Sequence, residues 1–470
     1  MCSQNCTITN RNITMDTKAL RQKILDLAIH GKLVPQDPND EPASVLLERI
    51  KAEKERLIKE GKIKRSKKSA KSSDTPHYEN VPFELPNSWV WCRLEDIAYV
   101  ASGSTPDKTC FVENGVPYIK MYNLRNQKID FAYHPQYITE EVHNGKLQRS
   151  RTEVGDLIMN IVGPPLGKLA IIPTTLPQAN FNQAAVLIRP YKFKEVLVSY
   201  LKVYLEEMSE INSIATRGSA GQVNISLTQS QNMRIPIPPL NEVRRIIEEV
   251  SKYDILIDSL KQNITDIQNL IAYTKSKILD LAIHGKLVPQ DPNDEPAIEL
   301  LKRINPDFTP CDNGHYTQLP EGWAICKMKQ ITSITNGKSQ KNVETLNGIY
   351  PIYGSGGVIG RANQYLCIAG STIIGRKGTI NNPIFVEEHF WNVDTAFGLK
   401  ANDAILDKYL YYFCLSFDFS KLDKSTAMPS LTKTSIGNVL IPIPPYKEQE
   451  RIVAKIDMVL DTMNEILRAV

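Results

Sequence analysis

The sequence predicts an α+β protein: two mixed α/β domains separated by a long antiparallel coiled-coil pair of helices, in a circular, pseudo-two-fold organisation. Three observations predict this class. A run of twenty-one residues, Lys23–Ala43, recurs letter for letter at Lys277–Ala297. A heptad pattern of apolar residues runs through 241–285. Two stretches with the same order of strand and helix patterns, 81–240 and 318–445, follow the two copies of the repeat.

The composition favours a folded chain of several domains and excludes some broad classes. The chain has 470 residues, of which 42% are hydrophobic and 23% charged, so it can bury more than one core and is not globally disordered. We find neither a transmembrane run nor a secretory signal, and the eight cysteines show no C-x-x-C spacing. We therefore expect a cytoplasmic protein with reduced thiols. The net charge of +4 indicates no particular partner.

The chain is expected to begin with an extension, 1–14, and a helical region, 15–50. Asp16 or Thr17 can cap the helix at its start, and Gly31 ends it. A basic linker, 51–80, follows. Six cations fall within ten residues there: Lys62, Lys64, Arg65, Lys67, Lys68 and Lys71. A solvated tether is the simpler interpretation, because the second linker, 286–317, is not basic; a sequence-independent phosphate contact is the alternative.

The two globular stretches show matching patterns. In 81–240, strand-like alternation at 154–173 and 181–190 precedes a helix around 196–211. In 318–445 the corresponding segments are 371–386, 393–400 and 404–417. We therefore expect two mixed α+β domains of one type.

The helix 241–285 has the clearest pattern, with steps of four and three residues over about five heptads. Its seam positions are Ile246, Val250, Tyr253, Ile257, Leu260, Ile264, Ile267, Ile271, Thr274, Ile278 and Leu281. The C-terminal helical region, 446–470, repeats the pattern at Ile452, Ile456, Val459, Met463, Ile466 and Val470. The two terminal helices together correspond to one copy of the central helix, so we expect the central helix and this broken one to pack antiparallel.

No catalytic motif can be assigned. The segment 443–446 resembles the Asp/Asn-Pro-Pro-Tyr loop of amino-methyltransferases, but Ile443 cannot accept a hydrogen bond from a target amine. The glycines of 354–360 lack the spacing and the following helix of a dinucleotide loop. His30 and His284 lie at helix C-termini, where a histidine can bond the last carbonyls. We therefore expect neither catalytic residues nor a metal site in this chain.

Repeated motifs resemble the specificity (S) subunits of type I restriction–modification systems, the HsdS family. Leu-Pro-x-x-Trp opens each globule, at Leu85–Trp89 and Leu319–Trp323. Ile-Pro-x-Pro-Pro closes each one, and Glu-x-x-Arg-Ile starts the following helix at Glu242 and Glu448. The helix-ending repeat Ile-Leu-Asp-Leu-Ala-Ile-His-Gly-Lys completes the likeness, which covers about 15–470.

The resemblance implies that each globule is a target recognition domain for one half of a bipartite, asymmetric DNA site. It implies that the helices space these domains and dock two modification (HsdM) methyltransferase subunits, which restriction (HsdR) subunits join. S-adenosylmethionine, ATP and Mg²⁺ would then be used by those partners for adenine methylation and ATP-dependent cleavage. This chain would be a non-catalytic subunit without a cofactor of its own.

Candidate DNA-binding residues are polar or cationic side chains, several of them beside glycines. In the first globule they are Lys120, Asn123, Arg125, Asn160, Lys168, Asn182, Gln183, Arg217, Gln222 and Asn224. In the second they are Lys338, Gln340, Lys341, Arg361, Arg376, Lys377, Asn392 and Lys433. The loop Gly375–Gly378 is the strongest candidate because two cations lie between two glycines. The alternative function is a two-headed coiled-coil scaffold that joins protein partners without DNA specificity.

Overall fold

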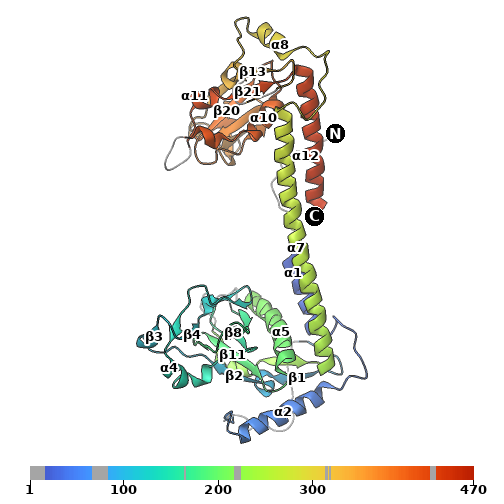
Figure 1. Cartoon of the computed structure of the whole chain (residues 1–470), viewed down its shortest axis with the longest axis vertical. Coiled ribbons are helices and arrows are strands. Elements are labelled where there is room, and N and C mark those ends of the chain that lie inside the picture. Colours follow the sequence, from blue (N-terminus) through green and yellow to red (C-terminus); the bar gives the residue numbers. More distant parts are fainter. Residues whose placement is uncertain are drawn as a thin grey trace. The chain divides into compact units, whose positions relative to one another are not determined.

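The chain forms two compact units in the computed structural model, the N-terminal unit (Met15–Gln262) and the C-terminal unit (Asn263–Val470) (Figure 1). The structure describes residues 16–65, 83–163, 166–215, 224–312, 316, 319–423 and 430–469. The predicted extension 1–14 lies outside the described residues. The division between the units falls inside the central helix α7 (Leu240–Ile283), so each unit contains about half of it.

The N-terminal unit combines helices with four small sheets. Its main helices are α1 (Thr17–Ile29), α2 (Ala43–Lys59) and α5 (Lys194–Ala215). Short helices are α3 (Leu94–Ile97), α4 (Glu140–Asn144) and α6 (Leu227–Gln231). Asp16, one of the two predicted caps, accepts a hydrogen bond from the backbone N–H of Ala19 at 2.8 Å, as an N-cap does.

The sheets of the N-terminal unit are mainly antiparallel. β1 (Val90–Arg93) pairs with β12 (Arg234–Ile237). One four-stranded sheet has the order β2 (Ala98–Ser102), β11 (Ala185–Pro190), β8 (Leu157–Asn160) and β9 (Leu169–Ile171). The other has the order β10 (Asn180–Phe181), β4 (Val116–Ile119), β7 (Tyr137–Ile138) and β3 (Phe111–Val112), with β10 parallel to β4. A small hairpin joins β5 (Leu124–Arg125) to β6 (Lys128–Ile129).

The C-terminal unit repeats this topology. β13 (Ala324–Lys327) pairs with β21 (Leu440–Ile443). A four-stranded sheet has the order β14 (Thr332–Asn336), β20 (Ala396–Ala401), β17 (Ser371–Gly375) and β18 (Ile384–Val386). A second sheet has the order β16 (Gly357–Ala362), β15 (Tyr350–Gly354) and β19 (Trp391–Asn392), and β15 is parallel to β19.

The helices of the C-terminal unit also correspond to those of the first. They are α8 (Ala297–Ile304), α9 (Met328–Ile331), α10 (Asp407–Ser416), α11 (Lys433–Gly437) and α12 (Tyr446–Ala469). The expected strands and the helix of each globule are therefore present in the predicted order. This confirms two mixed α/β domains of one type.

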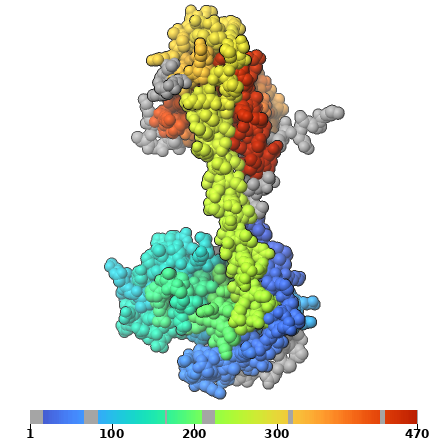
Figure 2. All heavy atoms as spheres, turned by 45° about the vertical axis from the view of Figure 1, so that its right-hand side comes forward, coloured from blue at the N-terminus to red at the C-terminus, as the bar shows by residue number. Residues whose placement is uncertain are grey.

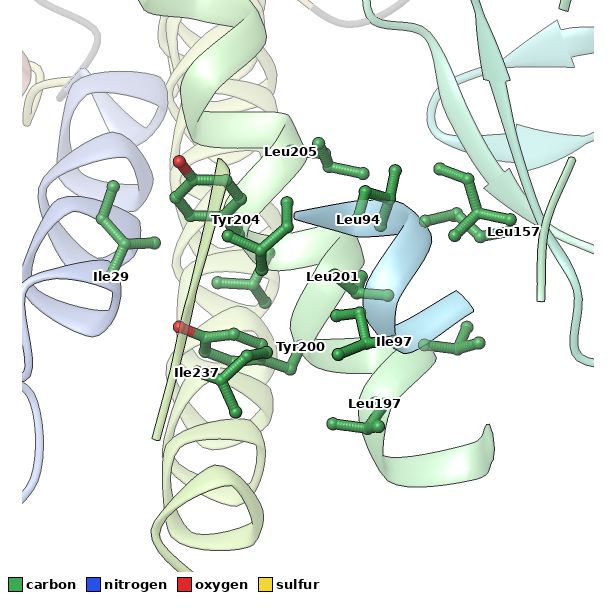
Figure 3. Packing of buried hydrophobic residues seen from close by; sticks show 14 of the residues in the cluster. Ile29, Leu94, Ile97, Leu157, Leu197, Tyr200, Leu201, Tyr204, Leu205 and Ile237 are labelled. Atoms are coloured by element: carbon green, nitrogen blue, oxygen red, sulfur yellow. The ribbon is translucent and has the colours of Figure 1, made fainter. Parts of the chain in front are cut away.

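Each unit has a core in which helices cover the sheet. Figure 3 shows Tyr200 and Tyr204 of α5 with Ile237 of β12. The Tyr200 hydroxyl donates to the carbonyl of Pro236 at 2.6 Å, which satisfies the one polar atom of a fully buried ring. Tyr409 of α10 donates to the carbonyl of Pro442 in the same way, at 2.9 Å.

The predicted seam of α7 is buried at every seventh residue, namely Val250, Ile257, Ile264, Ile271 and Ile278. The first half packs in the core with α1, and the second half packs with Ile452, Ile456 and Met463 of α12 (Figure 2). Ile246 is buried, whereas Leu260, Ile267, Thr274, Leu281 and Val459 are only half-buried. Tyr253 and Ile466 are exposed and are corrections to the predicted seam, because these alternate positions lie at the margin of a one-sided interface.

Both predicted linkers contain helix, which corrects their description as linkers. Residues 51–59 continue α2, and Arg56 there pairs with Glu53 and Glu60, which lie one turn to either side. Of the six cations, Lys62 pairs with Glu60, Arg65 pairs with Glu55, and Lys64 is exposed. The other three, Lys67, Lys68 and Lys71, lie outside the described residues. Within 286–317, α8 buries Ala297 and Leu301.

Candidate nucleic-acid interface

The repeated motifs of the sequence meet in one cluster in each unit, which we call the junction. In the N-terminal unit, Gln36 Nε2 lies 2.5 Å from Glu242 Oε1, and the Trp89 indole N–H donates to the same oxygen at 3.0 Å. Arg245 pairs with Asp40 at 2.6 Å. The helix-ending repeat therefore binds the Leu-Pro-x-x-Trp motif and the start of α7 together.

The junction of the C-terminal unit is built in the same way. Gln290 Nε2 donates to Glu448 Oε1 at 2.6 Å, and Trp323 donates to Glu448 Oε2 at 3.0 Å. Arg451 pairs with Asp294 at 2.6 Å. Both junctions need a glycine at the helix end. Gly285 has φ +66°, and a Cβ there would lie 2.3 Å from Pro320 Cγ.

The two junction glutamates are almost fully buried, each 1% exposed. Burial raises the pKa of Glu242 and of Glu448, and the hydrogen bonds from the glutamine and tryptophan oppose that rise. The hydrogen bond from Arg245 lowers the pKa of Asp40. These buried polar groups hold each globule on its helices and leave its loops free for another task.

Loops from several strand ends converge at one end of the C-terminal unit, which we call its loop edge: 337–338, 354–357, 375–378, 393–395 and 430. Backbone hydrogen bonds tie them together. Lys338 N donates to Asn392 O at 3.0 Å, and Val393 N donates to Tyr353 O at 2.9 Å. Arg376 N donates to Thr395 O at 2.7 Å, and Lys377 forms a β-bridge with Ser430.

The N-terminal unit has a matching loop edge: 103–105, 120–123, 161–163, 182–184 and 224. Ser104 N donates to Phe181 O, and Asn182 N donates to Ile119 O, both at 3.1 Å. Ile161 N donates to Ala184 O at 2.8 Å, and Val162 forms a β-bridge with Asn224. The same backbone frame therefore presents different side chains in the two units.

The loop edge of the C-terminal unit is cationic. Lys338 and Lys377 are exposed, and Arg376 is half-buried with its guanidinium 5.9 Å from the Phe397 ring centroid. Lys433 is exposed at the start of α11, close in sequence to the bond that joins Leu431 N to Arg376 O at 2.8 Å. These four predicted residues therefore lie in or beside one surface, where cations can contact phosphates or guanines.

The loop edge of the N-terminal unit is mainly polar. Gln183 and Asn224 are exposed, and Gln183 accepts a hydrogen bond from the Thr105 hydroxyl. Lys120 is half-buried, with its ammonium 5.5 Å from the Phe111 ring centroid. Asn182 is half-buried, and its Oδ1 is buried with no hydrogen-bond partner among the described residues. Because this oxygen is buried, it is not open to a base edge.

Three predicted DNA contacts are corrections, because their side chains are buried and bonded within the protein. Asn123 is 1% exposed and donates to Tyr133 O at 2.7 Å, and Asn160 is 2% exposed and donates to Val162 O at 2.9 Å. Asn392 is 0% exposed and donates to Ala396 O at 3.1 Å. An asparagine that satisfies main-chain groups shapes a loop and is not available to a base.

The remaining candidates are spread more widely. Arg125 lies in the β5–β6 hairpin, 4.0 Å above the Tyr133 ring. Arg361 lies at the far end of the β15–β16 hairpin and donates to Ile349 O at 3.2 Å. Lys168 and Gln340 are half-buried, and Lys341 is exposed. Arg217 and Gln222 lie outside the described residues.

Sequence reasoning missed Arg149, which lies beside Ser104 of the first loop edge. Arg149 is exposed, and its Nη2 donates to Ser104 Oγ at 3.0 Å. Forty-five residues separate these two side chains in the chain. No local pattern connects them, so only the fold could bring this cation to the edge.

Comparison with known proteins gives a consistent result for both units. The family model described as the type I restriction modification DNA specificity domain matches residues 86–269 and 320–470. The specificity subunit of the Escherichia coli restriction enzyme EcoAI is 28% identical, over 96% of this chain and 90% of that protein. The EcoEI specificity subunit from the same species is 31% identical, over 67% and 61%.

Two solved structures share the fold. The HsdS subunit of Thermoanaerobacter tengcongensis has a TM-score of 0.52 and 18% identity, over 83% of this chain and 93% of that one. A chain from a structure titled for complex assembly and conformational transition of the type I R-M system has a TM-score of 0.58 and 20% identity. It covers 83% of this chain and 94% of its own.

Proposed function

Because the chain belongs to the family of type I restriction–modification DNA specificity subunits, we propose that each loop edge recognises one half of a bipartite, asymmetric DNA site. DNA recognition is the function of the family, and a specificity subunit has a non-catalytic role. The proposal rests on one observation: two loop edges with matching backbone bonds carry different side chains. Two half-sites of different sequence require different side chains, and the matching backbone of the two loop edges can present them in the same way.

The test uses the full chain in complex with its modification subunits. Residues 81–240 are exchanged for the corresponding segment of another family member, and the methylated motif is determined by sequencing. We expect one half-site to change and the other to stay, because each loop edge is built within one unit. A change in both halves would contradict the proposal. The control keeps the native residues 81–240 and carries only the sequence changes that the cloning leaves at the two ends of the segment. Its methylated motif should be unchanged.

A second experiment tests the cationic loop. Arg376→Ala with Lys377→Ala should weaken binding of a duplex target and reduce its salt dependence, since each phosphate contact adds about one unit to the salt slope. Lys408→Ala is the matched control, because Lys408 pairs with Asp457 on a helix away from the edge. Equal losses in both variants would argue against a DNA contact at 375–378.

We also propose that α7 packs antiparallel with the two terminal helices as a coiled-coil pair, in a pseudo-two-fold organisation that spaces the two domains. Support comes from the junctions, where the end of one helix bonds to the start of the next: Gln36 to Glu242 and Gln290 to Glu448. Gln36 and Gln290 make corresponding contacts in the two copies of the repeat, as do Asp40 and Asp294. This is the repetition that a circular organisation requires.

The proposed partners are two modification subunits, with restriction subunits joining them. Large apolar side chains lie exposed on the helices, and they are candidates for the docking surface: Ile255, Leu256, Leu270, Tyr273 and Met458, each at least half exposed. Methylation with S-adenosylmethionine and cleavage with ATP and Mg²⁺ would belong to those partners.

None of the described helices has the length and apolar character to cross a membrane. We place the proposed complex in the cytoplasm with its DNA substrate. The alternative, a scaffold without DNA specificity, has no support, because the DNA specificity family model covers both globules.

A further inference from the structure

The β15–β16 hairpin of the C-terminal unit has an open glycine tip. Residues Gly354–Gly357 turn the chain, and Gly357 has φ +125°, a conformation that other residues rarely adopt. A Cβ at Gly356 or Gly357 would meet nothing within 4 Å. Gly356 and Gly357 at the tip therefore lie in open space.

Two β-branched side chains follow the tip and stand exposed. Val358 is 56% exposed and Ile359 is 55% exposed. A regular strand would turn neighbouring side chains to opposite faces, but the pairing shifts between Ile352 and Tyr353, which leaves Ile359 as an extra residue. Because of this bulge, both apolar side chains face solvent.

The hairpin tip adjoins the cationic loop of the same loop edge. A Cβ built on Gly375 would lie 3.2 Å from Ser355 Cβ, so the tip and the loop 375–378 are in contact. Arg376 and Lys377 follow directly. The exposed apolar pair therefore lies beside two cations, and such a surface can meet phosphates and base edges together.

Groove dimensions decide how such a hairpin can approach DNA. A two-stranded ribbon fits the major groove, which is about 12 Å wide. In the major groove the apolar feature of a base pair is the C5-methyl group of thymine. Valine and isoleucine make no hydrogen bond to a base edge, but they can make apolar contact with this methyl group.

We propose that Val358 and Ile359 recognise thymine methyl groups in the half-site bound by the C-terminal unit. The inference rests on the proposed division of the site between the two loop edges. The N-terminal unit places a different hairpin after its corresponding strand β4: β5–β6, whose tip carries Arg125, Asn126, Gln127 and Lys128. That polar hairpin offers hydrogen bonds where the C-terminal unit offers branched alkyl groups.

The experiment replaces thymine by uracil, which lacks the methyl group, one position at a time in the recognised duplex. The complex of the full chain with its modification subunits is used, after sequencing has given the motif and the domain exchange has assigned its halves. Removing one contacted methyl should weaken wild-type binding about four-fold at one or two positions of the C-terminal half-site, the cost of one buried methyl group. In V358A/I359A, thymine and uracil at those positions should bind equally.

Two controls keep the result specific. Leu346 is fully exposed, and the neighbouring Thr345 N bonds to Arg361 O at the far end of the hairpin, so L346A should keep the wild-type preference for thymine. In V358A/I359A, uracil effects in the other half-site should persist, which shows that the complex is intact. A half-site without thymine, no uracil effect in the wild type, or a preference that survives in V358A/I359A would overturn the inference. Failure of the proposed function would instead appear earlier, as a motif whose halves do not follow the exchanged domain.

Discussion

At the scale of single residues, the two junctions show how similar contacts can be made with different atoms. Glu242 accepts both of its hydrogen bonds at Oε1, whereas Glu448 accepts one at each oxygen. The neighbouring residues also differ. Gln449 is buried, and its Nε2 donates to Ala404 O at 3.0 Å, whereas the corresponding Val243 is fully buried and has an apolar side chain. Each junction therefore satisfies its buried polar groups with a different set of hydrogen bonds.

We predict that Glu448→Gln destabilises the protein more than Glu242→Gln. A glutamine at 242 can accept both hydrogen bonds at its single carbonyl oxygen, but at 448 one donor would face an amide NH₂. The loss should be about 1–3 kcal/mol for E448Q, the cost of a buried donor left unpaired, and close to zero for E242Q. Thermal unfolding of the two variants measures the difference, and equal melting temperatures would contradict it.

The same glutamates should make stability depend on pH. Their pKa in the folded protein is raised above the ordinary 4.5, so the folded state holds these protons more tightly than the unfolded state. The contribution of these two carboxyls to the free energy of unfolding is complete below pH 4.5 and is lost as the pH rises through their raised pKa. As the pH falls from 7 to about 4.5, the melting temperature of the wild type should therefore rise relative to that of the double variant E242Q/E448Q. A constant difference across this range would show that the carboxyls do not titrate there.

At the scale of elements, α7 presents two kinds of apolar residue along one helix. Ile257 is 3% exposed in the core, and its neighbour Leu256 is 61% exposed. The heptad pattern identifies the buried series because burial on one side of a helix repeats with the helical period. The exposed set falls outside the seam and has no partner within the described residues, which is why we assign it to docking.

Aspartate substitutions at these neighbouring positions should separate stability from assembly. Ile257→Asp places a charge in the core without a partner and should cost at least about 3 kcal/mol in unfolding free energy. Leu256→Asp changes the surface and should stay within about 0.5 kcal/mol, yet weaken binding of the modification subunits. Unfolding and co-purification measure the two effects. Full assembly by L256D would argue against this docking surface.

At the scale of the whole molecule, we propose that α7 sets the gap between the half-sites. Inserting four residues between Ile257 and Ile271 adds about one helical turn, roughly 6 Å, and nearly preserves the seam. We expect the non-specific spacer in the methylated motif to lengthen by about one or two base pairs, with both half-sites unchanged. The readout is the motif obtained by sequencing.

A matched insertion provides the control for this prediction. Four residues placed between the exposed Glu387 and Glu388 extend a loop within the C-terminal unit and should leave the spacer unchanged. An unaltered spacer in the helix insertion, or altered half-site bases, would show that the helices do not measure the gap.

The sequence by itself determined the repeat, the two mixed α/β domains and the buried heptad positions, because these follow from local periodicity and from identity between segments. It also gave the family motifs whose residues meet in the junctions. It could not separate accessible from buried asparagines: Asn392 and Asn224 have the same chemistry, yet one bonds to the main chain inside the protein and the other lies on the surface.

Only the tertiary structure decided which residues share a loop edge. Arg149 and Ser104, or Ser355 and Gly375, are brought together by pairings between strands distant in the chain, and those pairings leave no periodic trace in the sequence. The structure also turned Val358 and Ile359 outward through a bulge, which a strand pattern would not indicate. Local patterns fix elements, whereas the recognition surface depends on long-range packing, and this is the physical reason for the division.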